Sequence, residues 1–155
     1  MRDLDKRILV QLIKDCQQPV SKIAEKVGVT RQTVAKEIKQ LKDSGMINSF
    51  TVKLNPEKFG LRTKAYILMR EDPRSEFRKR NEEILKRIHQ VSGFYRLFGE
   101  HDAILEVQVK NSEELTELVK RIHKLKGVRE TDTLIVHSTV KDKSEDPVEG
   151  LLEEY

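Results

Sequence analysis

Two short helical patterns around a glycine turn, in residues 19–45, constrain the fold of this chain more than any other feature. The first pattern ends at Gly28, Thr30 is a suitable N-cap for the second, and Gly45 supplies a stop at its end. Two helices joined in this way form a helix-turn-helix, which places its second helix in the major groove of DNA. The segment therefore predicts a DNA-binding module.

The second helix of this segment has an apolar side and a polar side. Val34, Ile38 and Leu41 repeat at i, i+4 and i+7, so they share one face. The face opposite that stripe carries Gln32, Lys36, Lys39 and Gln40, whose side chains are of types that bond base edges and phosphates. The candidate DNA contacts are Thr30, Arg31, Gln32, Thr33, Lys36, Lys39 and Gln40.

The charge distribution bears on the alternative, an ordinary helical hairpin with a solvated charged face. Residues 1–52 contain 10 basic and 6 acidic side chains, whereas residues 53–155 contain 20 of each. The formal net charge of +4 therefore lies in the first part. Because phosphate neutralisation supplies most non-specific DNA affinity, this asymmetry favours DNA binding by the first part alone. The excess is small, so one copy is expected to bind weakly.

The chain length fits one average domain or two small ones, and turn residues indicate a division. A helical pattern over residues 3–15 completes a three-helix core, and alternation with period two over residues 46–54 predicts a strand of a winged-type module. The expected organisation is a helix-turn-helix domain at 1–53, a linker at 54–61, a second domain at 62–140 and a tail at 141–155.

The second domain shows a βαββαβ pattern. The order predicts a ferredoxin-like α+β fold, with a four-stranded antiparallel sheet and helices on one face. The expected elements are strand 64–70, helix 76–91, strands 94–98 and 103–109, helix 112–125 and strand 133–140.

Apolar residues occupy both faces of this predicted sheet. Ala65, Ile67 and Met69 point to one side of the first strand, and Tyr66 and Leu68 point to the other. Helices cover only one face, so the other is expected to pack against a second copy. The alternative is a scattering of exposed apolar side chains, which is common on protein surfaces. We expect a homodimer, which also suits two DNA half-sites.

Several motifs together resemble the Lrp/AsnC (feast/famine) family of transcriptional regulators. They are LDKRIL, IAEKVGVTRQTVAKEIKQLKDSGMI, the FGL that ends the linker, and GEHD within the βαββαβ module. The resemblance covers residues 4–140. It implies that the second domain is a regulator-of-amino-acid-metabolism (RAM) domain, which dimerises through its sheet, assembles into tetramers or octamers, and binds an amino-acid effector between dimers.

The resemblance also implies an effector site. The family's Gly-x-x-Asp turn matches Gly99, Glu100, His101 and Asp102, and a threonine-bearing segment matches Thr131 and Thr133. Glycine allows a close backbone approach, and an aspartate accepts hydrogen bonds from an α-ammonium group, so a zwitterion suits such a turn. The alternative is a plain hairpin loop whose aspartate satisfies local N–H groups.

Three positions depart from the family pattern. Glu37 stands in the second helix where relatives often carry arginine, Lys42 follows the leucine where an acid is common, and Gln17 replaces a basic residue in the loop before the helix-turn-helix. These changes leave the fold prediction intact and bear on which operator is read.

The last segment, 141–155, is acidic and contains Pro147 and Gly150. We expect a mobile, solvated tail, with docking through Leu151, Leu152 and Tyr155 as the less favoured alternative.

No feature favours an enzyme, a metal site or a bound cofactor. His101 and Asp102 are adjacent, which is not triad geometry, and the histidines lack zinc spacing. Cys16, the only cysteine, is expected to be a small core residue. With no signal peptide or membrane span in the sequence, we expect a cytoplasmic protein without a membrane partner.

Two other binding functions fit parts of the pattern. A βαββαβ sheet with Phe94 and Phe98 on one face superficially resembles an RNA-binding sheet, but the module is neutral and the facing strand lacks a paired aromatic residue. DNA packaging without ligand control is the other alternative. Its binding would be insensitive to DNA sequence. Double-stranded DNA remains the preferred nucleic-acid partner.

Overall fold

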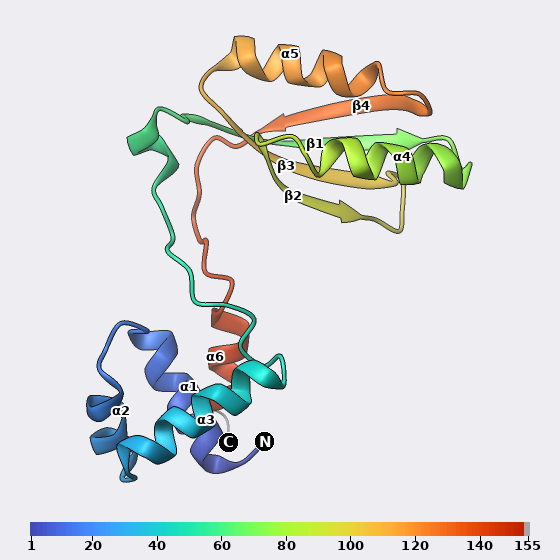
Figure 1. Cartoon of the computed structure of the whole chain (residues 1–155). Helices are drawn as coiled ribbons and strands as arrows, with labels where there is room; N and C mark the ends of the chain where they lie inside the picture. Colours follow the sequence, from blue (N-terminus) through green and yellow to red (C-terminus); the bar gives the residue numbers. More distant parts are fainter. Residues whose placement is uncertain (154–155) are drawn as a thin grey trace. The chain divides into compact units, whose positions relative to one another are not determined.

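The computed structural model describes residues 1–153, and the chain divides into two compact units (Figure 1). The helical unit comprises Met1–Lys53 together with the segment that begins at Lys141. The sheet unit comprises Leu54–Val140.

The helical unit is built on three helices with well-defined ends. Thr30 caps the third helix, since its Oγ1 accepts a hydrogen bond from Thr33 N at 3.2 Å. Gly28 ends the second helix in the left-handed conformation, with φ +71°, which suits glycine. The buried core of the unit is Ile8, Ile23, Ala24, Val27, Val34 and Leu41. The helices are α1 (Asp3–Lys14), α2 (Val20–Val27) and α3 (Arg31–Asp43).

The strand predicted over residues 46–54 is absent. Residues 48–55 form no helix or strand, and both Phe50 and Val52 are exposed. A strand is stable only when its backbone N–H and C=O groups pair with a neighbour. No such neighbour lies beside this segment within residues 1–153, so the alternating pattern does not produce a strand in the single chain.

The C-terminal segment folds, contrary to the prediction of a solvated tail. Helix α6 (Asp146–Glu153) contacts α1, and Leu152 is buried. Leu151 is exposed, and Tyr155 lies outside the described residues. Burial of the Leu152 side chain offsets part of the conformational entropy that is lost when the helix forms. Since residues 141–155 contain two basic and six acidic side chains, the helical unit is less positive than residues 1–52 alone.

The sheet unit confirms the βαββαβ order. Its strands pair antiparallel in the order β2-β3-β1-β4, and two helices pack on one face (Figure 1). Alternate residues of β1 and β3 are buried against these helices. The elements are the short 3₁₀ helix η1 (Pro56–Phe59), β1 (Thr63–Glu71), α4 (Ser75–Leu85), β2 (Val91–Arg96), β3 (Ala103–Val109), α5 (Ser112–His123) and β4 (Val128–Ile135).

Several predicted boundaries in this unit are wrong: the end of α4, both ends of β2 and both ends of β4. Helix α4 ends at Leu85, because tight turns follow and Val91 pairs with Val107 in the sheet. Gly93, predicted to stop the helix, lies inside β2. Strand β4 begins at Val128, five residues before the prediction. It is an edge strand with polar residues on both sides, which removes the apolar alternation that marks a buried strand.

The sheet face away from the helices carries apolar side chains, as predicted for β1. Register places Tyr95, Ile104 and Leu68 in one row across β2, β3 and β1, and Tyr66 beside Leu134 in the next row. Tyr95 is 56% exposed and Leu134 is 51% exposed. In a single copy this apolar surface remains open to water.

Candidate functional site

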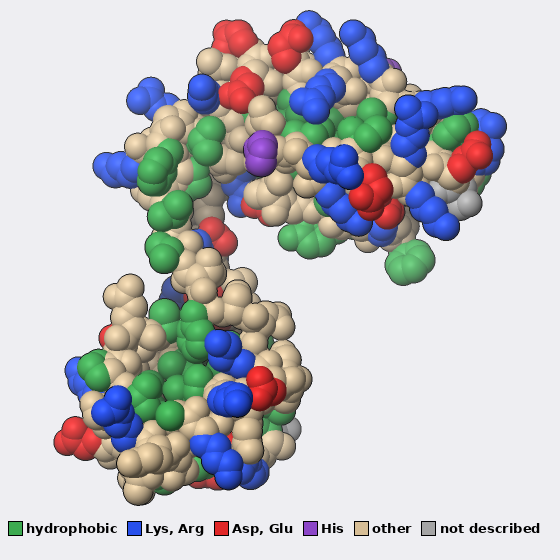
Figure 2. Space-filling model, in the orientation of Figure 1, with side chains coloured by type: hydrophobic (Ala, Val, Ile, Leu, Met, Phe, Trp, Pro, Cys, Tyr) green, Lys and Arg blue, Asp and Glu red, His purple; other side chains and the backbone are tan. Residues whose placement is uncertain are grey.

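The predicted DNA contacts lie along the solvent side of α3. Arg31, Gln32, Lys36, Lys39 and Gln40 are exposed. Thr33 is half-buried, and its hydroxyl contacts that of the cap residue Thr30 at 2.9 Å. On the side of the helical unit shown in Figure 2, Lys and Arg side chains are prominent and Asp and Glu side chains are fewer. The exposed side of α3 is thus free to meet a nucleic-acid surface.

The opposite side of α3 contains a buried carboxylate that the sequence pattern did not reveal. Glu37 is only 5% exposed and forms an ion pair with Arg2, which precedes α1. Arg2 Nη2 also lies 2.9 Å from Asp5 Oδ1 and donates to Gln40 Oε1 at 3.3 Å. Hydrogen bonds to Asp5 first, and then to Glu37, raise the pKa of Arg2 above its usual value. The sequence analysis did not find this cluster because Arg2 and Glu37 are far apart in the sequence, and no local pattern connects them.

The turn before α2 is held by a buried amide. Gln18 Nε2 donates to the carbonyl oxygens of Gln11 at 2.6 Å and Asp15 at 2.9 Å, and Gln18 Oε1 accepts from Lys26 Nζ at 3.1 Å. These bonds satisfy the last carbonyls of α1 and fix its connection to α2. Cys16 in this turn is exposed, so the prediction that it is a core residue is wrong.

The predicted effector loop joins β2 to β3. Gly99 has φ +142°, a backbone conformation that residues other than glycine rarely adopt. A Cβ atom added there would have no neighbouring atom within 4 Å. The carboxylate of Asp102 is already bonded within the chain. Its Oδ1 accepts from Arg78 Nη2 at 2.7 Å and its Oδ2 accepts from Glu71 N at 2.8 Å. Asp102 therefore ties the loop to β1 and α4.

The other predicted effector residues are spread around the same end of the sheet. Glu100 is exposed and forms an ion pair with Arg70, and His101 is half-buried. Thr131 and Thr133 lie on β4, where they pair in register with Met69 and Ile67. Thr131 Oγ1 lies 3.5 Å from His123 Nδ1. Within residues 1–153, no hydrogen bond connects these threonines to the loop.

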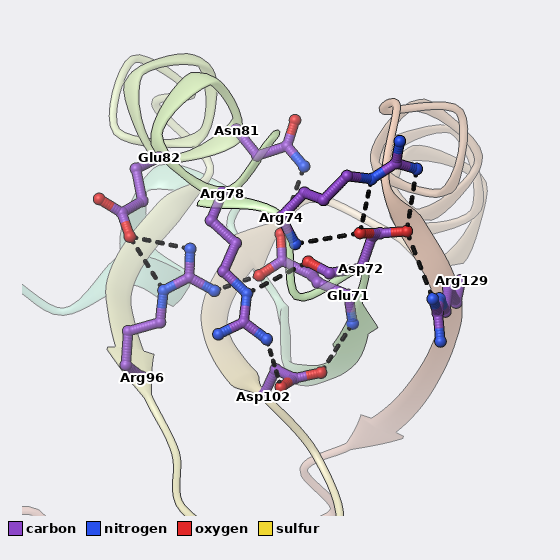
Figure 3. Close-up of polar contacts among 9 residues, drawn as sticks. All are labelled: Glu71, Asp72, Arg74, Arg78, Asn81, Glu82, Arg96, Asp102 and Arg129. Carbon is purple, nitrogen blue, oxygen red and sulfur yellow. Dashed lines mark hydrogen bonds and ion pairs between the residues drawn. The ribbon is translucent and has the colours of Figure 1, made fainter. Parts of the chain in front are cut away.

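A polar cluster next to Asp102 was also missed by the sequence analysis (Figure 3). Its centre is Glu71, whose side chain is 1% exposed and forms an ion pair with Arg96. Asn81 Nδ2 donates to Glu71 Oε1 at 3.2 Å, and Arg96 Nη2 also lies 2.8 Å from Glu82 Oε1. The cluster joins the ends of β1 and β2 to α4. The charged run 70–72 and the arginines at 74 and 78 are the only local signal of it.

Asp72 extends this cluster toward β4 (Figure 3). Its Oδ1 accepts from Arg74 Nε at 2.9 Å, and its Oδ2 accepts from Arg129 Nη2 at 3.3 Å. Hydrogen bonds from the Arg74 side chain are the main cause that lowers the pKa of Asp72 well below its usual value. This carboxylate is therefore ionised at neutral pH and bridges two arginines.

Neither region resembles a metal centre. Among the described residues, no group of three or more His, Cys, Asp or Glu side chains has a metal-binding arrangement. Each helix within residues 1–153 is too short or too polar to span a membrane.

The two units match two described protein families. Residues 1–42 match the AsnC-type helix-turn-helix domain, and residues 64–146 match the Lrp/AsnC ligand binding domain. These matches define the chain as a DNA-binding transcriptional regulator that carries a ligand-binding domain.

Relatives along nearly the whole chain agree with that class. An uncharacterized HTH-type transcriptional regulator of Pyrococcus horikoshii is 34% identical over 144 residues, which cover 90% of this chain and 95% of the relative. The HTH-type transcriptional regulator FL11 of Pyrococcus furiosus is 32% identical, with 94% and 95% covered. The chain belongs to the Lrp/AsnC family of transcriptional regulators, and the relatives give no indication of an enzyme.

Solved structures show the same fold. An AsnC family transcriptional regulator from Agrobacterium tumefaciens is 26% identical and has a TM-score of 0.89, with 97% of this chain and 99% of that chain covered. The regulator NMB0573 from Neisseria meningitidis, in complex with L-Met, has a TM-score of 0.91 at 20% identity, with the same shares of the two chains covered.

Proposed function

We propose that this protein binds specific DNA sequences through α3 and that an amino-acid effector changes its assembly or its DNA affinity. The observation that carries the proposal is the exposed polar and basic side of α3 on a chain whose sheet unit matches a ligand-binding family. No metal or other cofactor is required by this function, and the expected cellular location is the cytoplasm.

The chemistry of α3 supports sequence reading. Gln32 near its N-terminus suits hydrogen bonding to base edges, while Lys36 and Lys39 suit contacts to phosphates. The helix is held by a cap at Thr30 and by a buried core on its other side. A rigid helix with exposed polar groups can dock in the major groove without refolding.

Two observations support an amino acid as the effector. The solved structure of the Neisseria regulator contains L-Met, and the loop that begins at Gly99 has backbone open to solvent. The bonds already made by Asp102 modify the expected chemistry. An α-ammonium group would have to share this carboxylate with Arg78 or replace it. We therefore propose that binding of the effector is linked to the Arg78–Asp102 pair.

The apolar open face of the sheet supports self-association. Two exposed side chains, Tyr95 and Leu134, lie on the two edge strands β2 and β4, and apolar residues of β1 and β3 lie between them on the same face. A second copy packed on this face would remove the surface from water, and a dimer would present two copies of α3 to two half-sites. We propose a homodimer that assembles further into tetramers or octamers. Leu134→Glu should lower the molar mass measured by light scattering.

Two experiments test the proposal. Calorimetry with each of the twenty amino acids identifies the ligand, and bound DNA is then selected from a random pool with and without that ligand. A defined palindromic site whose affinity shifts with one amino acid is the expected result. Asp102→Ala should then weaken ligand binding by roughly 1–3 kcal/mol. Binding of DNA without sequence preference and of no amino acid at millimolar concentration would instead identify a ligand-independent DNA-packaging protein.

A further inference from the structure

Arg2 connects the first helix of the helical unit to the helix that we propose reads DNA. Its backbone N donates to Asp5 Oδ2 at 3.1 Å, and its Nε donates to the same oxygen at 3.3 Å. Its Nη2 contacts Asp5, Glu37 and Gln40 together. One planar guanidinium thus binds a side chain of α1 and two side chains of α3.

The two carboxylates in this cluster depend on Arg2. The Asp5 and Glu37 side chains are 8% and 7% exposed. Within residues 1–153, the hydrogen bonds and ion pairs of both carboxylates go to Arg2. A buried carboxylate without a cation is strongly unfavourable, and two that lie close together repel each other. Without Arg2, α1 and α3 would be pushed apart at this end.

The cluster also lies beside the proposed DNA-contacting side of α3. Glu37 directly follows Lys36, and Gln40, three residues further, is within hydrogen-bond distance of Arg2. Rotation of α3 about its axis would move Lys36 and Gln40 together. The position of Glu37 against Arg2 therefore sets which side chains of α3 face outward.

We propose that Arg2 is a positioning residue for DNA binding: it fixes the rotation of α3 through Glu37 and cancels the acidic charge on that helix. The proposal rests on α3 being the DNA-reading helix, as proposed above. It assigns a role to Glu37 as well. Glu37 is one half of an interhelical pair.

The competing role for Arg2 is a direct phosphate contact, since its side chain is 60% exposed. The two roles differ in how they depend on Glu37. In a positioning role, Arg2 is needed only because Glu37 and Asp5 are both charged. Removal of the Glu37 carboxylate should therefore make Arg2 dispensable for DNA binding. A phosphate contact would be lost with Arg2 whatever residue 37 is.

The test measures affinity for the selected DNA site, as a function of salt, in full-length Arg2→Gln, Glu37→Gln and the double variant. Arg2→Gln should weaken binding about tenfold, because it leaves two buried carboxylates unpaired. The double variant has the same cluster charge as the native chain, and Asp5 keeps the backbone N–H of residue 2. It should bind within about threefold of the native chain, as should Glu37→Gln alone.

Arg7→Gln is the matched control for loss of one positive charge from α1. Arg7 lies 3.9 Å from Asp3, and both side chains are largely exposed. This variant should lower affinity by no more than about twofold, since exposed ion pairs contribute little. An equal loss in Arg7→Gln and Arg2→Gln would show a general charge effect and overturn the proposal.

A double variant as weak as Arg2→Gln, with a salt slope reduced by about one, would establish a phosphate contact and also overturn the positioning role. If Arg2→Gln does not fold, Arg2→Lys decides. An ammonium group cannot make the planar contacts to three side chains, so affinity should fall about threefold, and native affinity would refute the proposal. A native chain that binds no DNA would refute the proposed function itself.

Discussion

Each unit of this protein contains a cluster of charged side chains that joins its helices or strands, but the two clusters are built differently. In the helical unit one arginine serves two buried carboxylates, Asp5 and Glu37. In the sheet unit Glu71 and Asp102 each bond an arginine and also a neutral N–H donor, from Asn81 and from the backbone of Glu71 respectively. In the helical unit a single side chain neutralises both carboxylates. In the sheet unit several donors share the hydrogen bonding of the carboxylates.

The difference suggests how each unit responds to change. A cluster with one cation is sensitive to the loss of that cation, which suits the role in DNA binding that we propose for the orientation of α3. A cluster with several donors keeps part of its hydrogen bonding when one partner leaves, which suits the proposed competition of a ligand for Asp102. Four predictions follow from this comparison, ordered by size.

The largest effect is expected at Arg96 of the sheet unit. Arg96→Ala removes the cation from Glu71, whose side chain is almost fully buried. The free energy of unfolding should fall by about 3 kcal/mol, at the lower end for a broken buried pair because Asn81 still donates to Glu71. Urea denaturation followed by circular dichroism measures the loss. Arg87→Ala, at an exposed position in the turn between α4 and β2, is the control and should change little.

The packing of α6 gives the next effect, in the helical unit. Leu152→Ala removes a buried side chain and should lower the free energy of unfolding by about 2 kcal/mol. Leu151→Ala, its exposed neighbour, should have little effect. Equal stability of the two variants in thermal unfolding would show that α6 does not stabilise the unit.

The lysines of α3 should affect DNA binding rather than stability. Lys36→Ala and Lys39→Ala should each reduce the slope of log affinity against log salt by about one, with a loss of affinity of about 1 kcal/mol at low salt. Gln32→Ala should instead relax base preference. Binding to the selected site and to a scrambled duplex separates these effects, and unchanged slopes in both lysine variants would place the contact face elsewhere.

The smallest effect concerns pH and the sheet unit. Because the pKa of Asp72 is lowered in the folded state, its contribution to stability is complete above the unfolded value, about 3.9, and decreases as pH falls below it. The difference in stability between the native chain and Asp72→Asn should therefore be constant from pH 7 to 5 and shrink in more acidic solution. Urea unfolding at pH 7, 5 and 3 measures this difference in stability. An equal difference at all three pH values would contradict the prediction.

Local sequence patterns predicted the elements whose stability is local or whose burial is regular. The cap at Thr30, the turn at Gly28 and the alternation in β1 are short-range features, and each is present in the structure. The family resemblance added the pairing of a helix-turn-helix with a ligand-binding domain, which the family matches confirm. The individual DNA-binding and effector residues remain predictions.

Several of the errors concern contacts between distant parts of the chain, and another concerns an edge strand without apolar alternation. The alternating segment 46–54 needed a partner strand, and the edge strand β4 had no apolar period to reveal it. Burial of Leu152 depends on contacts between α6 and α1, which lie at opposite ends of the sequence. Patterns within a window of ten residues carry no information on such contacts.

Local sequence patterns were therefore sufficient to predict the order of elements in the sheet unit, the polar side of α3 and the apolar character of both sheet faces, because periodicity and capping act over a few residues. Three features are evident only in the folded chain: the burial of Glu37 against Arg2, the bond between Asp102 and Arg78, and the packing of the last segment within the helical unit. Each of these depends on which side chains meet across the fold, since a buried charge persists only where a partner from another element neutralises it.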